Sequence, residues 1–297
     1  MADKDGFKVN TLIIGAGRSG TTSLFTYLEA HNDVCFSIIK EVHYFSIVEL
    51  FRKGEKYYHS FFRRCKNEPV IASADTYLLM DHEAIPRIHA YNPEMKIIVM
   101  LRDPVKRAYS SYNYSANYGH HEAYAAFLDS IEVEKNIDEE TNIVTRNNVG
   151  HFYGSLYYEH LSKWTTVFPR EQFLLLKTSD LKESPQKLSE ELFSFLDLSN
   201  HQGEIERVNP AAVPGSMKLE KFLLDRDSVS RKFIRRVTPR FLKNLIMGSG
   251  VVDKLHDANR KEQNVIPLSK EEAEKAMRFF TNDLQLLKEE FGIDIII

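Results

Sequence analysis

The stretch TLIIGAGRSGTTSL, residues 11–24, runs from an apolar segment through a glycine-rich turn into small hydroxyl residues. The apolar residues predict a buried strand, and the residues after the turn open an amphipathic helix. A strand–turn–helix junction of this composition is suited to hold a phosphate group. Glycines let the backbone approach the anion, free N–H groups converge on it, and the helix dipole favours its charge. A turn that binds nothing is the ordinary alternative.

Three phosphate-binding patterns compete for this turn. Residues 15–20 match the GxGxxG fingerprint of dinucleotide-binding proteins, and Glu41 follows at about the distance of a ribose-binding acid. This match would indicate an oxidoreductase that uses NAD(P) or a flavin. The nucleoside-triphosphate loop GxxxxGK[ST] fails, because Thr21 stands where the lysine is required. In the third pattern Arg18 is the cation, and a compact 5′-phosphate binds without a metal ion. Its turn glycines and hydroxyl donors are Gly17, Gly20, Ser19, Thr21 and Thr22.

A second anion-binding element follows the apolar run MKIIVML at residues 95–101. Asp103 is suited to cap a helix that Pro104 begins. Arg102 is therefore expected at the carboxyl end of a strand, with Ser110 about two turns into the next helix. Ligands of open α/β sheets bind at this edge. Two anion sites indicate a ligand with phosphates at two ends, which a dehydrogenase does not need.

The two motifs, GAGRSGTT and LRDPVKRAYSSY, resemble the 5′- and 3′-phosphate-binding elements of sulfotransferases that use 3′-phosphoadenosine 5′-phosphosulfate (PAPS). Residues 40–45, KEVHYF, are similar to the KE-x-H-F-F segment of the heparan sulfate sulfotransferase branch. Residues 154–181 and 188–198 resemble the C-terminal half of the superfamily. The resemblance implies that PAPS is the sulfonate donor and that no metal is required. The nucleotide-binding residues that it implies are Gly17, Arg18, Ser19, Gly20, Thr21, Thr22, Arg102 and Ser110.

The resemblance also implies catalytic roles. Sulfuryl transfer needs an aligned nucleophile and leaving group, a cation at the bridging oxygen and a proton acceptor. Arg18 would stabilise the leaving group, at a loop position where many relatives have lysine. Glu41 is the candidate general base, provided that partial burial raises its pKa. Lys40 would offset the charge of Glu41 or contact the sulfonate, and His43 would orient Glu41 or share its proton.

Two features leave the base and the acceptor open. His89, in the segment PRIH, faintly resembles the histidine base of cytosolic aryl and steroid sulfotransferases, but it also fits an apolar helical pattern. Residues 72–77, ASADTY, lack the acid, the lysine and the proline that heparan-type relatives often have, and Asp75 stands in the place of the proline. We therefore expect a small neutral or cationic acceptor, or a glycan, rather than an anionic polysaccharide. A hydroxyl is favoured over an amine. A non-catalytic nucleotide-binding protein is a further alternative.

The acceptor pocket is expected between residues 40–45 and an insertion at 119–148, because the acceptor must approach the sulfonate on the side of Glu41. The insertion reads as a short helix and a polar stretch, either facing substrate or forming a surface connection. Its acids, Glu122, Asp129, Glu132 and Glu134, would disfavour an anionic polymer. Aromatic residues that either line the pocket or pack in the core are Tyr44, Phe45, Tyr77, Tyr112 and Tyr153.

The composition is that of an ordinary globular protein, with 297 residues, 43% hydrophobic and 27% charged. A net charge of −3 argues against a nucleic-acid polymer as partner. Cys35 and Cys65 lack metal-binding spacing, so reduced, unpaired thiols are expected. The first residues carry no apolar leader, and no run approaches the roughly 18 apolar residues that span a bilayer. These features favour a cytosolic protein.

Apolar runs alternate with helical patterns, which predicts an α/β fold with a mostly parallel central sheet flanked by helices. Strands are expected at 10–15, 34–37, 69–73, 96–101 and 172–177. Helices are expected near 20–31, 56–64, 82–91, 104–117, 154–168 and 184–197, with a last one from the N-cap Ser269 to about residue 290. No repeat or long linker divides the chain. We expect one domain over 1–297, with a nucleotide-binding core at about 9–200 and a helical part at about 209–297. In the latter, Arg231, Lys232 and Arg235 either close over the nucleotide or form a solvated helix face.

Overall fold

The five predicted strands form one parallel sheet in the order β2-β3-β1-β4-β5. The computed structural model describes residues 7–117, 126–137, 141–199 and 267–295, and the backbone of 212–214 and 260–262. The strands are β1 (Thr11–Gly15), β2 (Val34–Phe36), β3 (Val70–Ala74), β4 (Lys96–Leu101) and β5 (Phe173–Lys177). All four pairings are parallel, so the carboxyl ends of the strands meet at one edge. The predicted fold class is confirmed.

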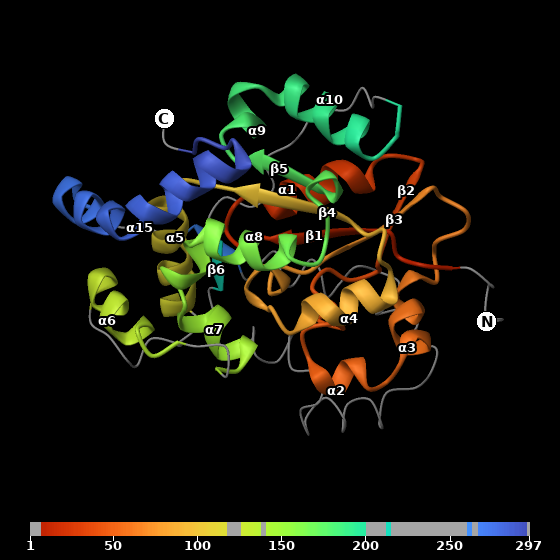
Figure 1. Cartoon of the computed structure of the whole chain (residues 1–297), viewed down its shortest axis with the longest axis horizontal. Coiled ribbons are helices and arrows are strands. Elements are labelled where there is room, and N and C mark those ends of the chain that lie inside the picture. The colour runs from red at the N-terminus through yellow and green to blue at the C-terminus, as the bar shows by residue number, and fades with distance from the viewer. Residues whose placement is uncertain are drawn as a thin grey trace.

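Helices cover both faces of this sheet (Figure 1). The first face packs against α1 (Thr21–Glu29) and α10 (Pro185–Phe195), and the second mainly against α4 (Ala84–Tyr91), α5 (Pro104–Asn117) and α8 (Tyr157–Thr165). The last long helix, α15 (Lys270–Phe291), lies beside α5 and α8. Short helical segments make up the other described helices. They are α2 (Val48–Phe51), α3 (Glu55–His59), η1 (Ser60–Phe62), η2 (Leu78–Met80), η3 (Phe127–Asp129), α6 (Ser130–Glu134), α7 (Ile143–Val149), η4 (Tyr153–Ser155), η5 (Arg170–Gln172) and α9 (Asp180–Glu183).

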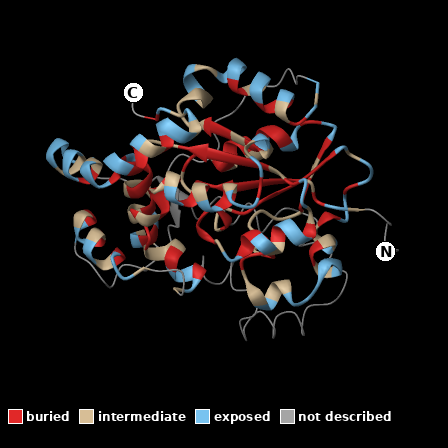
Figure 2. Cartoon of the chain, in the orientation of Figure 1, coloured by how far each residue is buried: buried red, intermediate tan, exposed pale blue. Residues whose placement is uncertain are grey.

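Alternation along the strands explains the two layers. In β1, Leu12 and Ile14 belong to the core on the second face, whereas Ile13 between them belongs to the core on the first. Successive side chains of a strand point to opposite faces, so a strand buried on both sides must be apolar throughout. Figure 2 shows the result: the strands are buried, and the outer surfaces of the helices are exposed.

Local signals fixed several helix ends. The Asp103 carboxylate accepts the Lys106 N–H at 2.8 Å, so Asp103 caps α5 as predicted. At the start of α15, Ser269 and Glu272 form a reciprocal capping box. Short helices such as α2 and α9 were not predicted, because one turn leaves no periodic pattern to read.

The two cysteines are paired, which corrects the expectation of free thiols. Cys35 in β2 and Cys65 after η1 form a disulfide, with their Cα atoms 5.5 Å apart. The fold brings together two residues that are 30 positions apart, a proximity that spacing alone does not reveal. Disulfides persist in oxidising compartments, so the inference from reduced thiols to the cytosol loses its basis.

The C-terminal part is described only in places. Residues 212–214 (β6, Ala212–Pro214) and 260–262 (β7, Arg260–Glu262) pair as antiparallel strands. The basic cluster at 231–235 lies outside the described residues. Within the described ranges, no helix combines the length and apolar character needed to cross a membrane.

Candidate functional site

The glycine-rich turn lies at the carboxyl edge of the sheet, between β1 and α1. Gly20 adopts φ +90°, and a Cβ added there would lie 2.8 Å from the Leu181 side chain, so this position requires glycine. The first bond of the helix runs from the Leu24 N–H to the Gly20 carbonyl at 3.2 Å. The N–H groups of the first turn before Leu24 therefore have no acceptor within the helix, which is the arrangement that binds anions.

Two arginines hold the carbonyl groups of this turn. Arg107 Nε donates to the Gly17 carbonyl at 3.0 Å, and Arg102 Nη1 donates to the Arg18 carbonyl at 2.9 Å. These bonds give the carbonyls of the turn cationic donors and tie the turn to the end of β4 and to α5. Arg102 thus lies at the end of β4 beside the turn, as its place in the sequence predicted.

Arg107 is a buried structural residue, although an arginine on a helix is most often a surface charge. Its side chain is 2% exposed and also donates to the His151 carbonyl at 2.9 Å. Burial lowers its pKa from the ordinary value. A signal was present, because Ala108, Ser111 and Ser115 form a small-residue face of α5 around it. Lys106, beside it, is exposed.

The side chain of Arg18 points toward α5. Its φ is +70°, its Nε donates to Ser110 Oγ at 3.3 Å, and its guanidinium stacks 4.6 Å from the ring centre of Tyr114. Arg18, Arg102 and Ser110 are therefore brought together on one side of the turn. This grouping of two cations and a hydroxyl can bind a phosphate.

Lys40 is on the other side, next to the start of α1. Its Nζ donates to Thr21 Oγ1 at 3.3 Å and Thr22 Oγ1 at 3.2 Å, and lies 3.4 Å from Glu41 Oε1. The structure therefore joins the predicted hydroxyl donors to the predicted base through one ammonium group. Ser19 differs from its neighbours, because its side chain is fully buried and its N–H donates to Ala16. Contact of Ser19 with a ligand stays a prediction.

Glu41 has the environment that a general base needs. The Thr76 backbone N–H donates to its Oε2 at 2.7 Å and the Thr76 hydroxyl to its Oε1 at 3.2 Å. Burial, followed by the nearby charge of Asp75, raises the pKa of Glu41, while Lys40 opposes this shift. The side chain remains 28% exposed, so an acceptor can reach it.

His43 lies beside Glu41 and is held by Asp75. Its Nδ1 is 2.9 Å from Asp75 Oδ1, and its ring packs at a tilt against that of Tyr77, with ring centres 4.1 Å apart. Burial alone would lower the pKa of His43, but the hydrogen bond and charge of Asp75 outweigh it, so the pKa is raised. Asp75 was noted only as a departure from a pattern. Its position directly after a buried strand was the signal that could have identified it.

Of the five candidate aromatic residues, only Tyr77 contacts this cluster among the described residues. Burial and the charge of Glu41 raise its pKa to about 12, and it is hydrogen-bonded to Asn147 of α7. Tyr44 and Phe45 are 2% exposed and pack around Tyr58 in the core. The remaining two, Tyr112 and Tyr153, pack against Phe127 and His160 respectively.

His89 lies far from this cluster in the topology. It is on the last turn of α4, the helix that returns toward the beginning of β4, and its ring packs against Phe168. Glu41 and Asp75 lie at the opposite, carboxyl edge of the parallel sheet. The geometry therefore favours Glu41 over His89 as the base.

The acids of the insertion do not form an acidic wall in the described residues. Glu134 is 6% exposed and accepts the N–H groups of His151, Phe152 and Tyr153 at 2.7–3.1 Å. Burial raises its pKa to about 7. Of the other described acids, Asp129 caps η3 by accepting the Ala126 N–H, and Glu132 pairs with Lys135. Glu122 lies outside the described residues.

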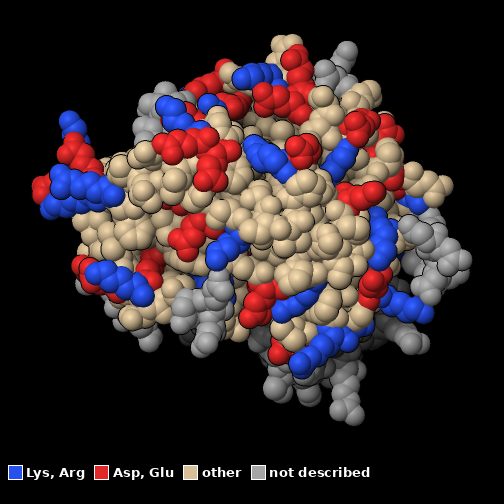
Figure 3. All heavy atoms as spheres, viewed as in Figure 1, with Lys and Arg blue, Asp and Glu red and all other residues tan. Residues whose placement is uncertain are grey.

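Charges on the molecular surface are mixed. On the face drawn in Figure 3, basic and acidic side chains alternate around an uncharged centre, without a continuous basic stripe.

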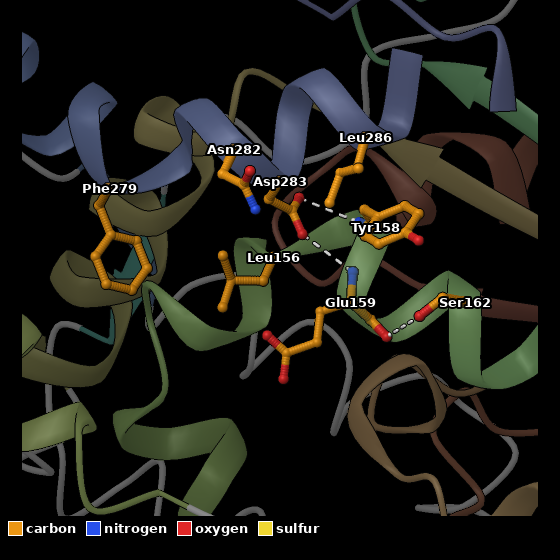
Figure 4. A pocket seen from close by; sticks show the side chains of 8 residues that line it. All are labelled: Leu156, Tyr158, Glu159, Ser162, Phe279, Asn282, Asp283 and Leu286. Carbon is orange, nitrogen blue, oxygen red and sulfur yellow. Dashed lines mark hydrogen bonds between the residues drawn. The ribbon is translucent and has the colours of Figure 1, made fainter. Parts of the chain in front are cut away.

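A separate hollow of about 300 Å³ lies between α8 and α15 (Figure 4). In it Asp283 of α15 accepts the N–H groups of Tyr158 and Glu159 at 3.1 and 3.0 Å, which ties α15 to the start of α8.

The α/β sheet brings a glycine-rich loop, a second cationic grouping and a carboxylate to the same edge, an arrangement that is suited to a ligand with two anionic groups. The profile of the sulfotransferase domain family matches residues 8–248. The chain therefore belongs to the sulfotransferase domain family, and the resemblance drawn from its motifs is confirmed.

Relatives of known name support this assignment. The chain is 25% identical to the membrane-associated sulfotransferase kil1 of Dictyostelium discoideum, over 65% of this chain and 56% of that protein. It is 28% identical to mouse carbohydrate sulfotransferase 15, over 67% of this chain and 46% of that protein. It is 27% identical to human heparan sulfate glucosamine 3-O-sulfotransferase 6, over 59% of this chain and 48% of that protein. The chain spans about half the length of these curated relatives.

Solved structures share the fold. A sulfotransferase from Alicyclobacillus acidocaldarius superposes with a TM-score of 0.64 at 20% identity, covering 97% of both chains. Mouse sulfotransferase SULT7A1, complexed with PAP, superposes with a TM-score of 0.51 at 14% identity, covering 96% of this chain and 89% of that one.

Proposed function

We propose that this protein transfers the sulfonate of PAPS to a hydroxyl group of a small-molecule or glycan acceptor. The observation that carries the proposal is the placement of Lys40, whose ammonium group links the hydroxyls of Thr21 and Thr22 to the carboxylate of Glu41. A cation is thereby available where a 5′-phosphate and a proton acceptor would meet. An amine is the less favoured acceptor.

The two anion-binding groupings fit the two ends of the donor. The turn at 15–20, with the first turn of α1, would hold the 5′-phosphosulfate. Arg18, Arg102 and Ser110 would hold the 3′-phosphate, because Arg18 donates to Ser110 of α5 and Arg102 donates to the Arg18 carbonyl. The complex of SULT7A1 with PAP supports a nucleotide with this pair of phosphates in this fold.

The transfer itself would be an in-line displacement. The acceptor oxygen forms a bond to sulfur while the bond from sulfur to the bridging phosphate oxygen breaks, and the electron pair of that bond stays on the phosphate. Glu41 would take the proton of the acceptor hydroxyl. Lys40 would neutralise the charge that develops on the bridging oxygen. Arg18 was expected in this role, but its bonds toward α5 support the 3′-phosphate role in this structure.

The acceptor would bind next to Tyr77 and α7, on the exposed side of Glu41. We retain a small neutral or cationic acceptor as the proposal. The acids of the insertion do not support this acceptor class, because Glu134 is buried. The proposal of a small neutral or cationic acceptor now rests on residues 72–77, because this segment supplies no cation that could bind an anionic polymer.

We also propose that the chain is one domain. We do not propose a cytosolic location, because the chain contains a disulfide.

The test is a transfer assay with ³⁵S-labelled PAPS against neutral metabolites, amines, uncharged glycans and heparan chains. We expect label in one of the first three classes, and about 10²–10⁴-fold slower labelling with the Glu41→Gln protein. Efficient labelling of heparan chains alone would overturn the acceptor proposal. Failure of every acceptor, with PAPS unbound, would overturn the activity itself.

A further inference from the structure

We propose that Asp75 is a positioning residue for proton transfer: it holds His43 with its Nδ1–H toward Asp75, next to Glu41. The inference rests on the proposed function, because it concerns how the candidate base is supported. Asp75 itself does not touch the reacting atoms.

The position of Asp75 is rigid. It follows β3 directly, its N–H donates to the Ile13 carbonyl of β1 at 2.9 Å, and it is 4% exposed. Its Oδ1 accepts two hydrogen bonds, from His43 Nδ1 at 2.9 Å and from the Tyr77 N–H at 3.2 Å. A buried carboxylate is retained only with such partners. The central sheet thus fixes the oxygen to which His43 is bound.

The backbone of the supported segment is strained. Glu41 adopts φ +58° and His43 adopts φ +55°, in the left-handed region that residues with a side chain rarely occupy. Such conformations persist only where surrounding contacts hold them. The bonds from Thr76 to Glu41 and from His43 to Asp75 are those contacts, and both partners belong to the segment directly after β3. This independent observation indicates that 75–76 sets the shape of 41–43.

The bond also decides the chemistry of the imidazole. One oxygen or nitrogen atom from each of Glu41, His43 and Asp75 lies within 4.8 Å of the others. With Nδ1–H donated to Asp75, a neutral His43 keeps a lone pair on Nε2, and a protonated His43 neutralises one of the two carboxylates. Among the described residues, the other titratable groups that interact with the cluster are Lys40, Tyr77 and the buried Tyr58. Asp75 therefore controls whether a cation stands beside the candidate base.

The most direct test is ¹⁵N NMR of the histidine rings in the full-length protein, with His43 assigned by comparison with His43→Gln. We expect the neutral ring of His43 to carry its proton on Nδ1 and to titrate above the ordinary pKa of about 6.5. An Nε2–H tautomer in the wild-type protein would overturn the proposal, whether or not any variant folds.

Asp75→Asn keeps the shape but removes the charge. It should lower the pKa of His43 by about one pH unit or more and leave binding of adenosine 3′,5′-bisphosphate within about twofold. The matched control is Asp283→Asn, which removes another buried carboxylate that accepts two N–H groups, far from the cluster. An unchanged His43 titration in Asp75→Asn would contradict the proposal. If the wild-type protein does not bind adenosine 3′,5′-bisphosphate at all, the proposed function is contradicted instead.

Once an acceptor is known, the pH dependence of kcat adds a kinetic readout. Asp75 raises the pKa of Glu41, so Asp75→Asn should move the acidic limb of the profile to lower pH and reduce kcat about 10- to 100-fold. A reduced kcat with an unmoved limb would mean that Asp75 is merely structural.

Discussion

At the scale of single residues, two carboxylates differ in role because their surroundings differ. Glu41 is held by Thr76 yet partly exposed, so it can exchange a proton with a ligand. Asp75, one strand end away, is buried and bound to His43, so it can act only through that ring. A sequence motif suggested the proposed role of Glu41, whereas the role proposed for Asp75 follows from its burial and its contact with His43.

Glu41→Gln tests the base directly. Glutamine keeps the size and the Thr76 contacts but cannot accept the proton, so turnover should fall by about 10²–10⁴-fold. Binding of adenosine 3′,5′-bisphosphate, measured by calorimetry, should stay nearly unchanged. His89→Ala is the control and should have little effect. If the alanine variant is inactive and the glutamine variant is active, Glu41 is not the base.

Arg102→Ala tests the second phosphate position. The variant should weaken binding of adenosine 3′,5′-bisphosphate by about 1.5–3 kcal/mol, the scale of a hydrogen bond to a charged group. Binding of 5′-AMP should change much less, because that ligand lacks the 3′-phosphate. Lys106→Ala removes an exposed neighbouring cation and serves as the control. Equal losses for both nucleotides would mean that Arg102 acts only by holding the Arg18 carbonyl.

At the scale of elements, the disulfide between β2 and the segment after η1 closes the loop that carries Lys40, Glu41 and His43. Closing a loop of this length stabilises a protein by about 2–4 kcal/mol. Reduction, or the double change Cys35→Ser and Cys65→Ser, should lower the free energy of unfolding by this amount in urea titrations. The same stability with and without reductant, and free thiols by mass spectrometry, would contradict the pairing.

The insertion is anchored by Glu134, and its anchor should respond to pH. The folded pKa, about 7, is raised above the ordinary 4.5, so the folded state retains a proton that the unfolded state has released. Its contribution to stability is therefore complete below about pH 4.5 and is lost as the pH rises through 7. Glu134→Gln should show a smaller drop in stability between pH 5 and pH 8 than the wild-type protein. An unchanged drop would mean that Glu134 is ionised throughout.

Local patterns predicted β4 and α5 with their observed ends, because an apolar run and the pair Asp103-Pro104 mark those ends within the sequence itself. Arg107 and the Cys35–Cys65 pair could not be predicted in the same way. Whether an arginine is buried, or two cysteines meet, depends on elements distant in the chain. For the same reason the motifs could point to candidate site residues, but the contacts of Arg18 with Ser110 and of Lys40 with Glu41 required the structure.

At the scale of the whole molecule, the parallel sheet gathers the glycine-rich turn, the end of β4 and the end of β3 at one edge. One ligand with two phosphates is therefore expected to bind there, and calorimetry without added metal is the decisive measurement. Adenosine 3′,5′-bisphosphate should bind, while NAD and ATP should bind far more weakly or not at all. Tighter binding of NAD than of the bisphosphate, or no binding of the bisphosphate, would contradict the account.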